Sequence, residues 1–327
     1  MANFWQGKLV FVTGCTGLLG SWLTAELIHK GANVLGLIHS DPTHSLLAYM
    51  GTIQRIDTIQ GDIRDFDLIA KILVENPVDI IFHLAAQTQV GVANRDPITT
   101  FDTNIKGTWT LLEIARCQPK PPGLIIASSA KVYGEQSELP YSEDTPLLGQ
   151  QPYDVSKACA DLITRTYAHS YNLPVAIARC ANLYGGGDLN WRRIVPGTIR
   201  SALQGERPIV RSDGTAKRNY IYVQDAVRGY LTLAQNLHRP DVCGEAFNFG
   251  VEAATTVLDM IHTIIRLSPQ SHLQPIILNE AQNEVQEQHL CSRKARQILD
   301  WQTRYSLEDG LRETISWYER YLATHAR

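Results

Sequence analysis

The sequence lacks the signals of several classes of protein. Its six cysteines are scattered with no Cys-x-x-Cys pair, which argues against a disulfide framework and against a zinc knuckle. The ten histidines show no metal-ligand spacing, so no metal site is expected. No apolar run approaches the ~20 residues that span a membrane, and a net charge of −3 gives no basic surface for nucleic acid. We therefore expect a cytoplasmic protein with neither a membrane nor a nucleic-acid partner.

A glycine-rich turn follows the first apolar segment. Residues 8–13 have the pattern of a short buried strand, and residues 18–29 have helical periodicity. Between and just inside them, glycines fall three apart at Gly14, Gly17 and Gly20. In a dinucleotide fingerprint, the first glycine makes the tight turn and the second admits the pyrophosphate. The third lets the helix pack on the strand. The helix N-terminus would then face the cofactor phosphates.

The end of the second expected strand, 33–38, bears on the choice of cofactor. An acidic residue about 20 positions after the glycines commonly binds the ribose hydroxyls of NAD. This chain has His39 and Ser40 there, with Asp41 slightly late. NAD is the expected cofactor. NADP stays open on this motif, because His39 and Ser40 leave room for a 2′-phosphate.

Apolar strand patterns and helical patterns alternate along most of the chain. Such alternation predicts an α/β fold with a doubly wound parallel sheet, of the Rossmann type, and helices on both faces. The expected strands are 8–13, 33–38, 53–60, 78–83, 123–128, 174–180 and 245–249. The further expected helices are 65–76, 97–117, 152–171 and 223–236.

The remaining segments are mixed in pattern and are expected to form a second, smaller lobe. We expect residues 1–182 plus 221–250 to form the NAD(P)-binding domain. Residues 183–220 plus 251–327 would form a discontinuous substrate lobe over the carboxyl edge of the sheet, where ligands bind in open α/β sheets. Within this lobe, Ser292 has the character of a helix cap, and 306–323 reads as an amphipathic helix.

Tyr153 and Lys157 are spaced for acid–base chemistry. Four residues are about one helical turn, so both side chains lie on one face of the expected helix. A free tyrosine has a pKa of about 10 and is a poor base at neutral pH. A lysine ammonium alongside favours the phenolate. The pair could then exchange a proton with a sugar hydroxyl while a cofactor takes the hydride.

Several further segments fit one family pattern. With the glycine turn and the Tyr153/Lys157 pair, they closely resemble the extended short-chain dehydrogenase/reductase family that modifies nucleotide sugars. Residues 152–161 and 182–188 look most like CDP-glucose 4,6-dehydratases. The resemblance covers nearly the whole chain in order. The segments that carry it are 61–65 (Gly-Asp-Ile-Arg-Asp), 83–87 (His-Leu-Ala-Ala-Gln), 104–108 (Asn-Ile-Lys-Gly-Thr), 128–134 (Ser-Ser-Ala-Lys-Val-Tyr-Gly) and 218–225 (Arg-Asn-Tyr-Ile-Tyr-Val-Gln-Asp).

The resemblance implies roles for individual residues. Ser129 would hydrogen-bond the substrate C4 oxygen, Tyr153 would be the base for that hydroxyl, and Lys157 would hold the nicotinamide ribose. Asn182 and Arg218, with Arg193 as a further candidate, would hold the sugar diphosphate, since a guanidinium suits phosphate. The implied cofactor-binding residues are Gly14, Gly17, Leu18, Leu19, Gly20, His39, Asp62, Ile63, Leu84, Ala85, Ala86, Gln87, Asn104, Tyr153 and Lys157.

The sequence departs from the dehydratase pattern beside Ser129. The family logic is transient oxidation at C4. A 4-epimerase returns the hydride to the other face of C4. A 4,6-dehydratase needs a C5 base and an acid for the departing water. Dehydratases carry Asp-Glu or Asp-Lys after the catalytic Ser/Thr, whereas this chain has Ala130 and Lys131. Lys131 would serve as a base if burial or a nearby cation lowers its pKa, but Ala130 cannot donate a proton.

Three interpretations follow from these residues. The first is an NAD-dependent nucleotide-sugar enzyme of the CDP-glucose 4,6-dehydratase type in which Ala130 replaces the usual acid. The second is a nucleotide-sugar 4-epimerase, or an epimerase at another carbon; a reductase with exchangeable NADPH is a smaller alternative. The third is a catalytically inactive cofactor-binding regulator, against which the retained Ser129, Tyr153 and Lys157 argue. The family habit also implies a homodimer through helices 97–117 and 152–171.

Overall fold

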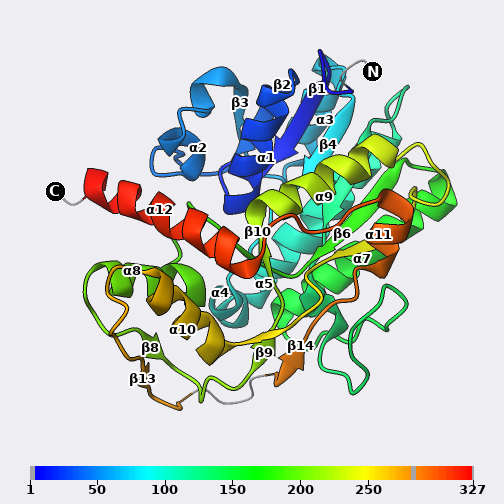
Figure 1. Ribbon diagram of the computed structural model, residues 1–327. Helices are drawn as coiled ribbons and strands as arrows, with labels where there is room; N and C mark the ends of the chain where they lie inside the picture. The colour runs from blue at the N-terminus through cyan, green and yellow to red at the C-terminus, as the bar shows by residue number, and fades with distance from the viewer. Residues whose placement is uncertain (1–3, 281–284, 326–327) are drawn as a thin grey trace.

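A seven-stranded parallel sheet lies at the centre of the computed structural model, which describes residues 4–280 and 285–325 (Figure 1). The strand order is β3-β2-β1-β4-β5-β6-β11, and every neighbouring pair is parallel. The predicted doubly wound sheet is therefore confirmed. The order changes direction between β1 and β4, which opens a crevice at their carboxyl ends. The strands are β1 (Leu9–Thr13), β2 (Asn33–Ile38), β3 (Asp57–Gln60), β4 (Ile80–His83), β5 (Gly123–Ala127), β6 (Val175–Cys180) and β11 (Ala246–Phe249).

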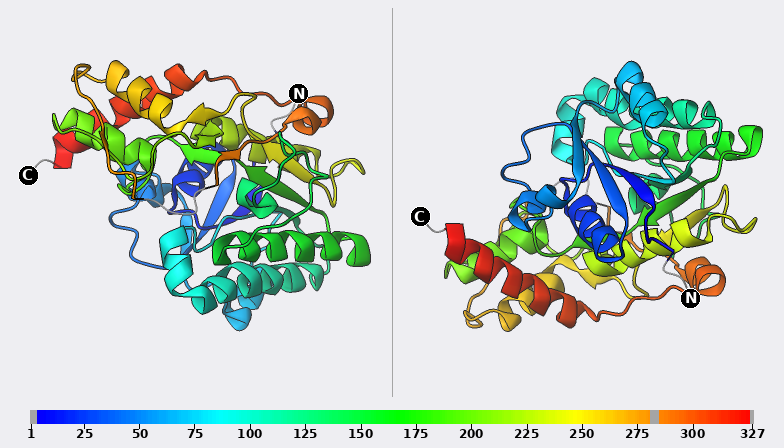
Figure 2. Two further views of the ribbon diagram at one scale, coloured as in Figure 1. Left: turned by 90° about the horizontal axis from the view of Figure 1, so that it is seen from below. Right: turned by 90° about the horizontal axis from the view of Figure 1, so that it is seen from above.

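Helices cover both faces of the sheet, as the two views of Figure 2 show. On one face lie α3 (Phe66–Glu75), α6 (Gly107–Arg116) and α7 (Pro152–Tyr171), and on the other α1 (Leu18–His29) and α9 (Val223–Asn236). Strand β1 is apolar throughout because both of its faces are buried. Val10 and Val12 pack into the core under α1 and α9, whereas Phe11 packs into the core under α3 and α6. A strand buried on both faces needs a continuous apolar run instead of alternation.

Two predicted elements are wrong in detail. The structure divides 97–117 into α5 (Pro97–Phe101), a π-helical turn η2 (Asp102–Lys106) and α6. Residues 53–60 contain a short 3₁₀ turn, η1 (Ile53–Arg55), before β3 begins. Hydrophobic periodicity does not distinguish a π turn from an α-helix. Such turns are frequent at functional sites, and η2 carries Asn104, which supports the wall of the site described below.

Residues 183–220, 251–280 and 285–325 supply the remaining elements, and in Figure 1 those of 190–218, 257–277 and 287–288 lie below the carboxyl ends of the sheet. Strands β7 (Asn182–Tyr184) and β10 (Tyr220–Tyr222) pair with each other where the chain leaves and re-enters the main sheet. The others are α8 (Ile194–Leu203), β8 (Ile209–Val210), β9 (Lys217–Arg218), β12 (Thr255–Thr256), α10 (Val257–Leu267), β13 (Ile276–Ile277), β14 (Glu287–Gln288), α11 (Arg293–Leu299) and α12 (Leu307–His325). Three short helices complete the fold: α2 (Leu46–Tyr49), α4 (Val90–Arg95) and η3 (Ala130–Tyr133). The boundaries of the two lobes stay a prediction.

Ser292 stands at the N-cap of α11, but its side chain does not cap the helix. Its hydroxyl donates to the Gly250 carbonyl oxygen at 3.1 Å and accepts from the Gly250 nitrogen at 2.9 Å. The cap residue therefore ties α11 to the loop after β11. Within the described ranges, no helix combines the length and apolarity needed to cross a membrane.

Candidate active site

A cavity of about 1570 Å³ runs from the glycine turn, along the carboxyl ends of the strands, to α8 and β9. It brings together all but one of the residues predicted to bind cofactor or substrate or to act in catalysis. A second cavity of about 390 Å³ beside α10 contains none of them. The predicted residues that line the large cavity are Gly14, Gly17, Leu18, Leu19, Gly20, His39, Asp62, Ile63, Leu84, Ala85, Ala86, Gln87, Ser129, Lys131, Tyr153, Lys157, Asn182, Arg193 and Arg218.

The three glycines of the turn differ in their surroundings, and so the reason for glycine differs from one position to the next. At Gly14, φ is +72° and a Cβ would lie 2.7 Å from the Ala85 nitrogen, so only glycine fits. At Gly20, a Cβ would collide with the Gly14 carbonyl oxygen, which allows α1 to pack against the turn. At Gly17, φ is −74°, and a Cβ would meet nothing closer than 3.4 Å. Protein packing therefore does not require glycine at Gly17. The free space beside Gly17 is part of the cavity. A pyrophosphate would need such space to approach the backbone closely.

Asp62 lines the cavity just after the end of β3, and its carboxylate is paired. Its carboxylate accepts from Arg64 Nε at 3.0 Å and from Arg64 Nη2 at 2.6 Å. His39 Nε2 lies 3.4 Å from the same carboxylate. The hydrogen bonds from Arg64 lower the pKa of Asp62, so this end of the cavity carries a fixed carboxylate paired with a guanidinium. The sequence prediction missed Arg64, which also lines the cavity.

Asn104 is the one predicted residue that does not line the cavity. It is 1% exposed in the π turn, and its amide brackets the backbone of Gln87. Its oxygen accepts from the Gln87 nitrogen at 2.8 Å, and its nitrogen donates to the Gln87 carbonyl oxygen at 3.1 Å. The same nitrogen lies 2.8 Å from Ser156 Oγ on α7. Asn104 thus supports the 84–87 segment from behind and ties it to the helix that carries Tyr153.

Tyr153 and Lys157 project from one face of α7 into the cavity. Lys157 Nζ donates to the Ala127 carbonyl oxygen at 2.8 Å, and burial lowers the pKa of Lys157 to about 8. The sequence predicts a neighbouring charge that favours the Tyr153 phenolate. Burial dominates instead and raises the pKa of Tyr153, opposed by a hydrogen bond with Ser129 and by the charge of Arg193. The groups that favour the phenolate therefore include Ser129 and Arg193, a role that the sequence does not indicate for Arg193.

The two residues after Ser129 differ from the acid–base pair of the dehydratase pattern. Ser129 caps η3, and its hydroxyl accepts from the Lys131 nitrogen at 3.2 Å. Lys131 lines the cavity, whereas Ala130 is 7% exposed and carries no proton donor. The charge of Lys131 acts on Asp154, whose pKa is raised by burial. One Asp154 oxygen is buried without a hydrogen-bond partner among the described residues, so Lys131 has an acidic neighbour that motif reasoning missed.

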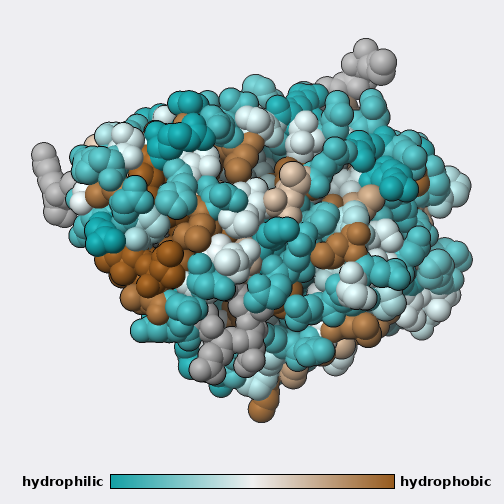
Figure 3. Space-filling model, turned by 60° about the horizontal axis from the view of Figure 1, so that its bottom comes forward, coloured by the Kyte–Doolittle hydropathy of each residue, from teal (hydrophilic) through white to brown (hydrophobic). Residues whose placement is uncertain are grey.

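The far end of the cavity is rich in guanidinium groups. Arg193 Nη1 donates to Asp188 Oδ2 at 2.9 Å, and Arg218 Nη1 donates to the Lys217 carbonyl oxygen at 2.8 Å. Arg192 and Arg211 line the same end. Beside it, exposed apolar residues of β8 and β13 contribute to the brown area toward the left of Figure 3. Planar cations beside apolar surface suit a ligand that joins phosphate to a heterocycle.

His83 lies at the end of β4 and has a structural environment. Nδ1 is 2.9 Å from Thr13 Oγ1, and Nε2 is 3.1 Å from Thr108 Oγ1. Burial lowers the pKa of His83 from 6.5 to about 3. No group of three or more His, Cys, Asp and Glu residues in the described part of the chain could hold a metal ion.

The low pKa of His83 predicts a loss of stability in acid. An unfolded chain protonates this histidine below pH 6.5, whereas the folded chain resists until about pH 3. The free energy of unfolding should therefore fall as pH drops through this window, by up to ~5 kcal/mol. Denaturant unfolding of wild type and His83→Gln at several pH values measures the difference. Equal pH slopes in the two proteins would contradict the assignment.

Comparison with known proteins places these features in a family. The family model described as GDP-mannose 4,6 dehydratase matches residues 11–314. A CDP-glucose 4,6-dehydratase of Salmonella typhimurium is 32% identical over 338 residues, covering 98% of this chain and 93% of that protein.

Solved structures agree with the sequence relatives. A UDP-glucose 4-epimerase of Thermotoga maritima superimposes with a TM-score of 0.87 at 26% identity, covering 96% of this chain and 99% of its own. A dTDP-glucose 4,6-dehydratase of Streptomyces venezuelae, solved with NAD bound, gives 0.84 at 26% identity, with 97% and 98% covered. This chain therefore belongs to the GDP-mannose 4,6-dehydratase family, within the extended short-chain dehydrogenases/reductases that modify nucleotide sugars.

Proposed function

We propose that this chain is an NAD-dependent enzyme that modifies a nucleotide-activated hexose through transient C4 oxidation, as a CDP-glucose 4,6-dehydratase-type enzyme with Ala130 in place of the usual acid. The carrying observation is that Ser129, Lys131, Tyr153 and Lys157 line one cavity with the glycine turn. The relation to a CDP-glucose 4,6-dehydratase along nearly the whole chain supports the choice of substrate. CDP-glucose is the nucleotide hexose to test first.

The residues of the cavity divide the work between them. Bound NAD supplies reversible removal of hydride from the sugar. Tyr153 accepts the proton of the C4 hydroxyl, and Ser129 hydrogen-bonds the same oxygen. Lys157, already fixed by the Ala127 carbonyl, holds the ribose beside them. Arg193 and Arg218 hold the diphosphate, because fixed guanidinium groups bind phosphate oxygens without a large cost in ordering.

Water loss then depends on Lys131. A 4-keto group acidifies the C5 proton, and Lys131 is the group in the cavity wall that would act as the base for that proton. The ammonium group that Lys131 then carries lies in the cavity wall beside Ser129. It would return the proton to the departing C6 hydroxyl. The C5–H and C6–O bonds break, a C5–C6 double bond forms, and Lys131 ends in its starting state. The hydride taken from C4 would then return to C6 while C5 regains a proton, so that the cofactor would end in its starting state as well. One group would thereby replace the usual pair of base and acid.

A 4-epimerase is the second candidate. The observation that favours it is the buried methyl group of Ala130, which leaves no separate acid for departing water. The likeness to a UDP-glucose 4-epimerase structure supports the same choice. Under this alternative the sugar keeps its mass and inverts one carbon, and Lys131 contacts the substrate without transferring the C5 proton.

An acid restored at position 130 should accelerate water loss. We expect Ala130→Asp to raise the rate of dehydration by about 10²-fold, the lower end of what a positioned general acid contributes. Ala130→Asn has nearly the same volume without the proton and should give no gain. Product formation from CDP-glucose, followed by mass spectrometry, measures both. If the Asp and Asn variants behave alike, the acid is not the missing component.

We further propose a homodimer through α5, α6 and α7. These helices pack side by side and expose Ile98 (73%), Trp109 (45%) and Leu162 (55%) on the side away from the sheet. Trp109→Glu should shift the protein to a monomer in light scattering, because a buried charge at an apolar interface is costly. Ile276→Glu alters an apolar residue elsewhere and should leave the dimer intact. A monomeric wild type would contradict the proposal.

The cysteines support a cytoplasmic location as part of the proposal. All six are free thiols, at positions that the structure describes. Burial raises the pKa of Cys15 to about 11 and that of Cys180 to about 12, so these two thiols stay protonated and inert. Free, unreactive thiols suit a reducing compartment.

A further inference from the structure

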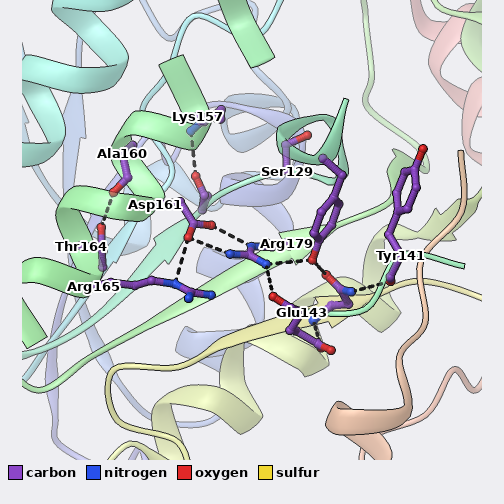
Figure 4. Close-up of polar contacts among 12 residues, drawn as sticks. Ser129, Tyr141, Glu143, Lys157, Ala160, Asp161, Thr164, Arg165 and Arg179 are labelled. Atoms are coloured by element: carbon purple, nitrogen blue, oxygen red, sulfur yellow. Dashed lines mark hydrogen bonds and ion pairs between the residues drawn. The ribbon is translucent and has the colours of Figure 1, made fainter. Parts of the chain in front are cut away.

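A buried polar cluster lies one turn beyond Lys157 along α7 and is drawn in Figure 4. At its centre Arg179, on β6, is fully buried. Its guanidinium donates to both carboxylate oxygens of Asp161, at 2.8 and 2.9 Å. Its Nη1 also donates to the Tyr133 hydroxyl at 2.9 Å and to the Glu143 carbonyl oxygen at 3.1 Å. The cluster thus joins β6 to α7, to η3 and to the loop that contains Glu143.

One side of the cluster belongs to the helix that carries the proposed base. Asp161 follows Lys157 by four residues and Tyr153 by eight, so it anchors α7 one and two turns beyond them. A second cation, Arg165, lies with its Nε 3.4 Å from Asp161. A bidentate contact fixes both the distance and the rotation of the helix, because two parallel hydrogen bonds must be kept.

The other side belongs to the turn that carries Ser129 and Lys131. Tyr133 ends η3, and its buried hydroxyl accepts from Arg179 and donates to Asn248 Oδ1 at 2.7 Å. Its ring also lies against the guanidinium, 5.1 Å from centroid to carbon. The hydrogen bond of Ser129 with Tyr153 spans the same two elements on the cavity side. The cluster is therefore a second connection between η3 and α7.

We propose that Tyr133 is a positioning residue, which through Arg179 and Asp161 sets the register between η3, with Ser129, and α7, with Tyr153. This role deepens the proposed function and rests on it. Displacement of a reacting group by about 1 Å can cost 10²-fold in rate. The Tyr133 hydroxyl thereby controls turnover without contacting substrate.

The test compares Tyr133→Phe with a matched variant. Each of Tyr133 and Tyr141 is a buried tyrosine whose hydroxyl is hydrogen-bonded, and their rings contact each other. The Tyr141 hydroxyl, however, bonds the Gln136 nitrogen and the Gly134 carbonyl oxygen and does not reach Arg179. Tyr141→Phe is therefore expected to lower the unfolding midpoint about as much, while it leaves kcat unchanged.

For Tyr133→Phe, we expect kcat with the nucleotide hexose to fall about 10-fold, with KM within twofold of wild type. The limb of the kcat–pH profile that reports Tyr153 should move to higher pH, because a weaker hydrogen bond from Ser129 stabilises the phenolate less. If the two variants lose stability alike and share the wild-type kcat and pH profile, the cluster has only a structural role and the proposal is overturned.

A second readout needs no turnover. Ring-labelled tyrosine NMR, with Tyr153 assigned by its loss in Tyr153→Phe, follows the ionisation of Tyr153 directly. A higher midpoint in Tyr133→Phe but not in Tyr141→Phe supports the positioning role, and identical midpoints overturn it. A wild type that turns over no nucleotide hexose would contradict the proposed function alone, while this titration would still decide the role of Tyr133.

Discussion

Tyr153→Phe is expected to lower turnover of the nucleotide hexose by roughly 10²–10⁴-fold, the range that a positioned acid–base group contributes. The phenyl ring keeps the packing of a side chain that is 8% exposed, but it cannot take the C4 proton. The unfolding midpoint and NAD affinity should change little. Single-turnover reduction of bound cofactor, followed by absorbance, measures the oxidation step itself.

A control tyrosine separates loss of the proton acceptor from loss of a buried hydroxyl. Tyr184 is buried outside the cavity, with its hydroxyl 3.4 Å from the Leu307 carbonyl oxygen. Tyr184→Phe should therefore retain turnover. Unchanged turnover in Tyr153→Phe would remove Tyr153 from the mechanism.

Gly17→Val is expected to weaken NAD binding by about 10- to 100-fold, the equivalent of the ~1–3 kcal/mol that an overpacked contact costs. The backbone at Gly17 is open to any residue, and a Cβ there meets only the Gly14 oxygen at 3.4 Å. The variant should therefore fold normally, with its methyl groups in the space that the pyrophosphate needs. Isothermal titration with NAD measures the affinity, and a thermal melt measures the stability of the fold.

Gly14→Ala provides the contrast. Its φ of +72° and a Cβ contact of 2.7 Å to the Ala85 nitrogen oppose any side chain, so the fold itself should lose stability. If Gly17→Val instead destabilises the fold and leaves NAD affinity intact, the glycine serves packing and the turn is not the phosphate site.

The main sheet could be predicted because its strands are buried on both faces. Val10, Phe11 and Val12 must all be apolar, since successive side chains enter opposite cores. The π turn at 102–106 could not be predicted, because periodicity is nearly blind to one extra residue in a helical turn. The short strands β8 and β13 also escaped prediction, since two residues carry no periodic pattern.

The site could be predicted where chemistry fixes a residue type in a local motif. The glycine turn and the Tyr153/Lys157 spacing are of this kind. Asp154 was not found, because only the fold brings Lys131 to it. Arg64 follows Asp62 by only two residues, but their pairing depends on the geometry of the turn, which the motif alone does not show. The direction of the Tyr153 pKa was also not predicted, since it depends on burial, which spacing along a helix does not reveal.

The most direct test of the central claim is one incubation with CDP-glucose deuterated at C4, analysed by mass spectrometry and NMR. The account predicts a product that has lost one water, is oxidised at C4 and carries the deuterium at C6. A product of unchanged mass with an inverted carbon would contradict the dehydratase and establish the epimerase. Such an epimer would still carry its deuterium at C4, because an epimerase returns the hydride to that carbon.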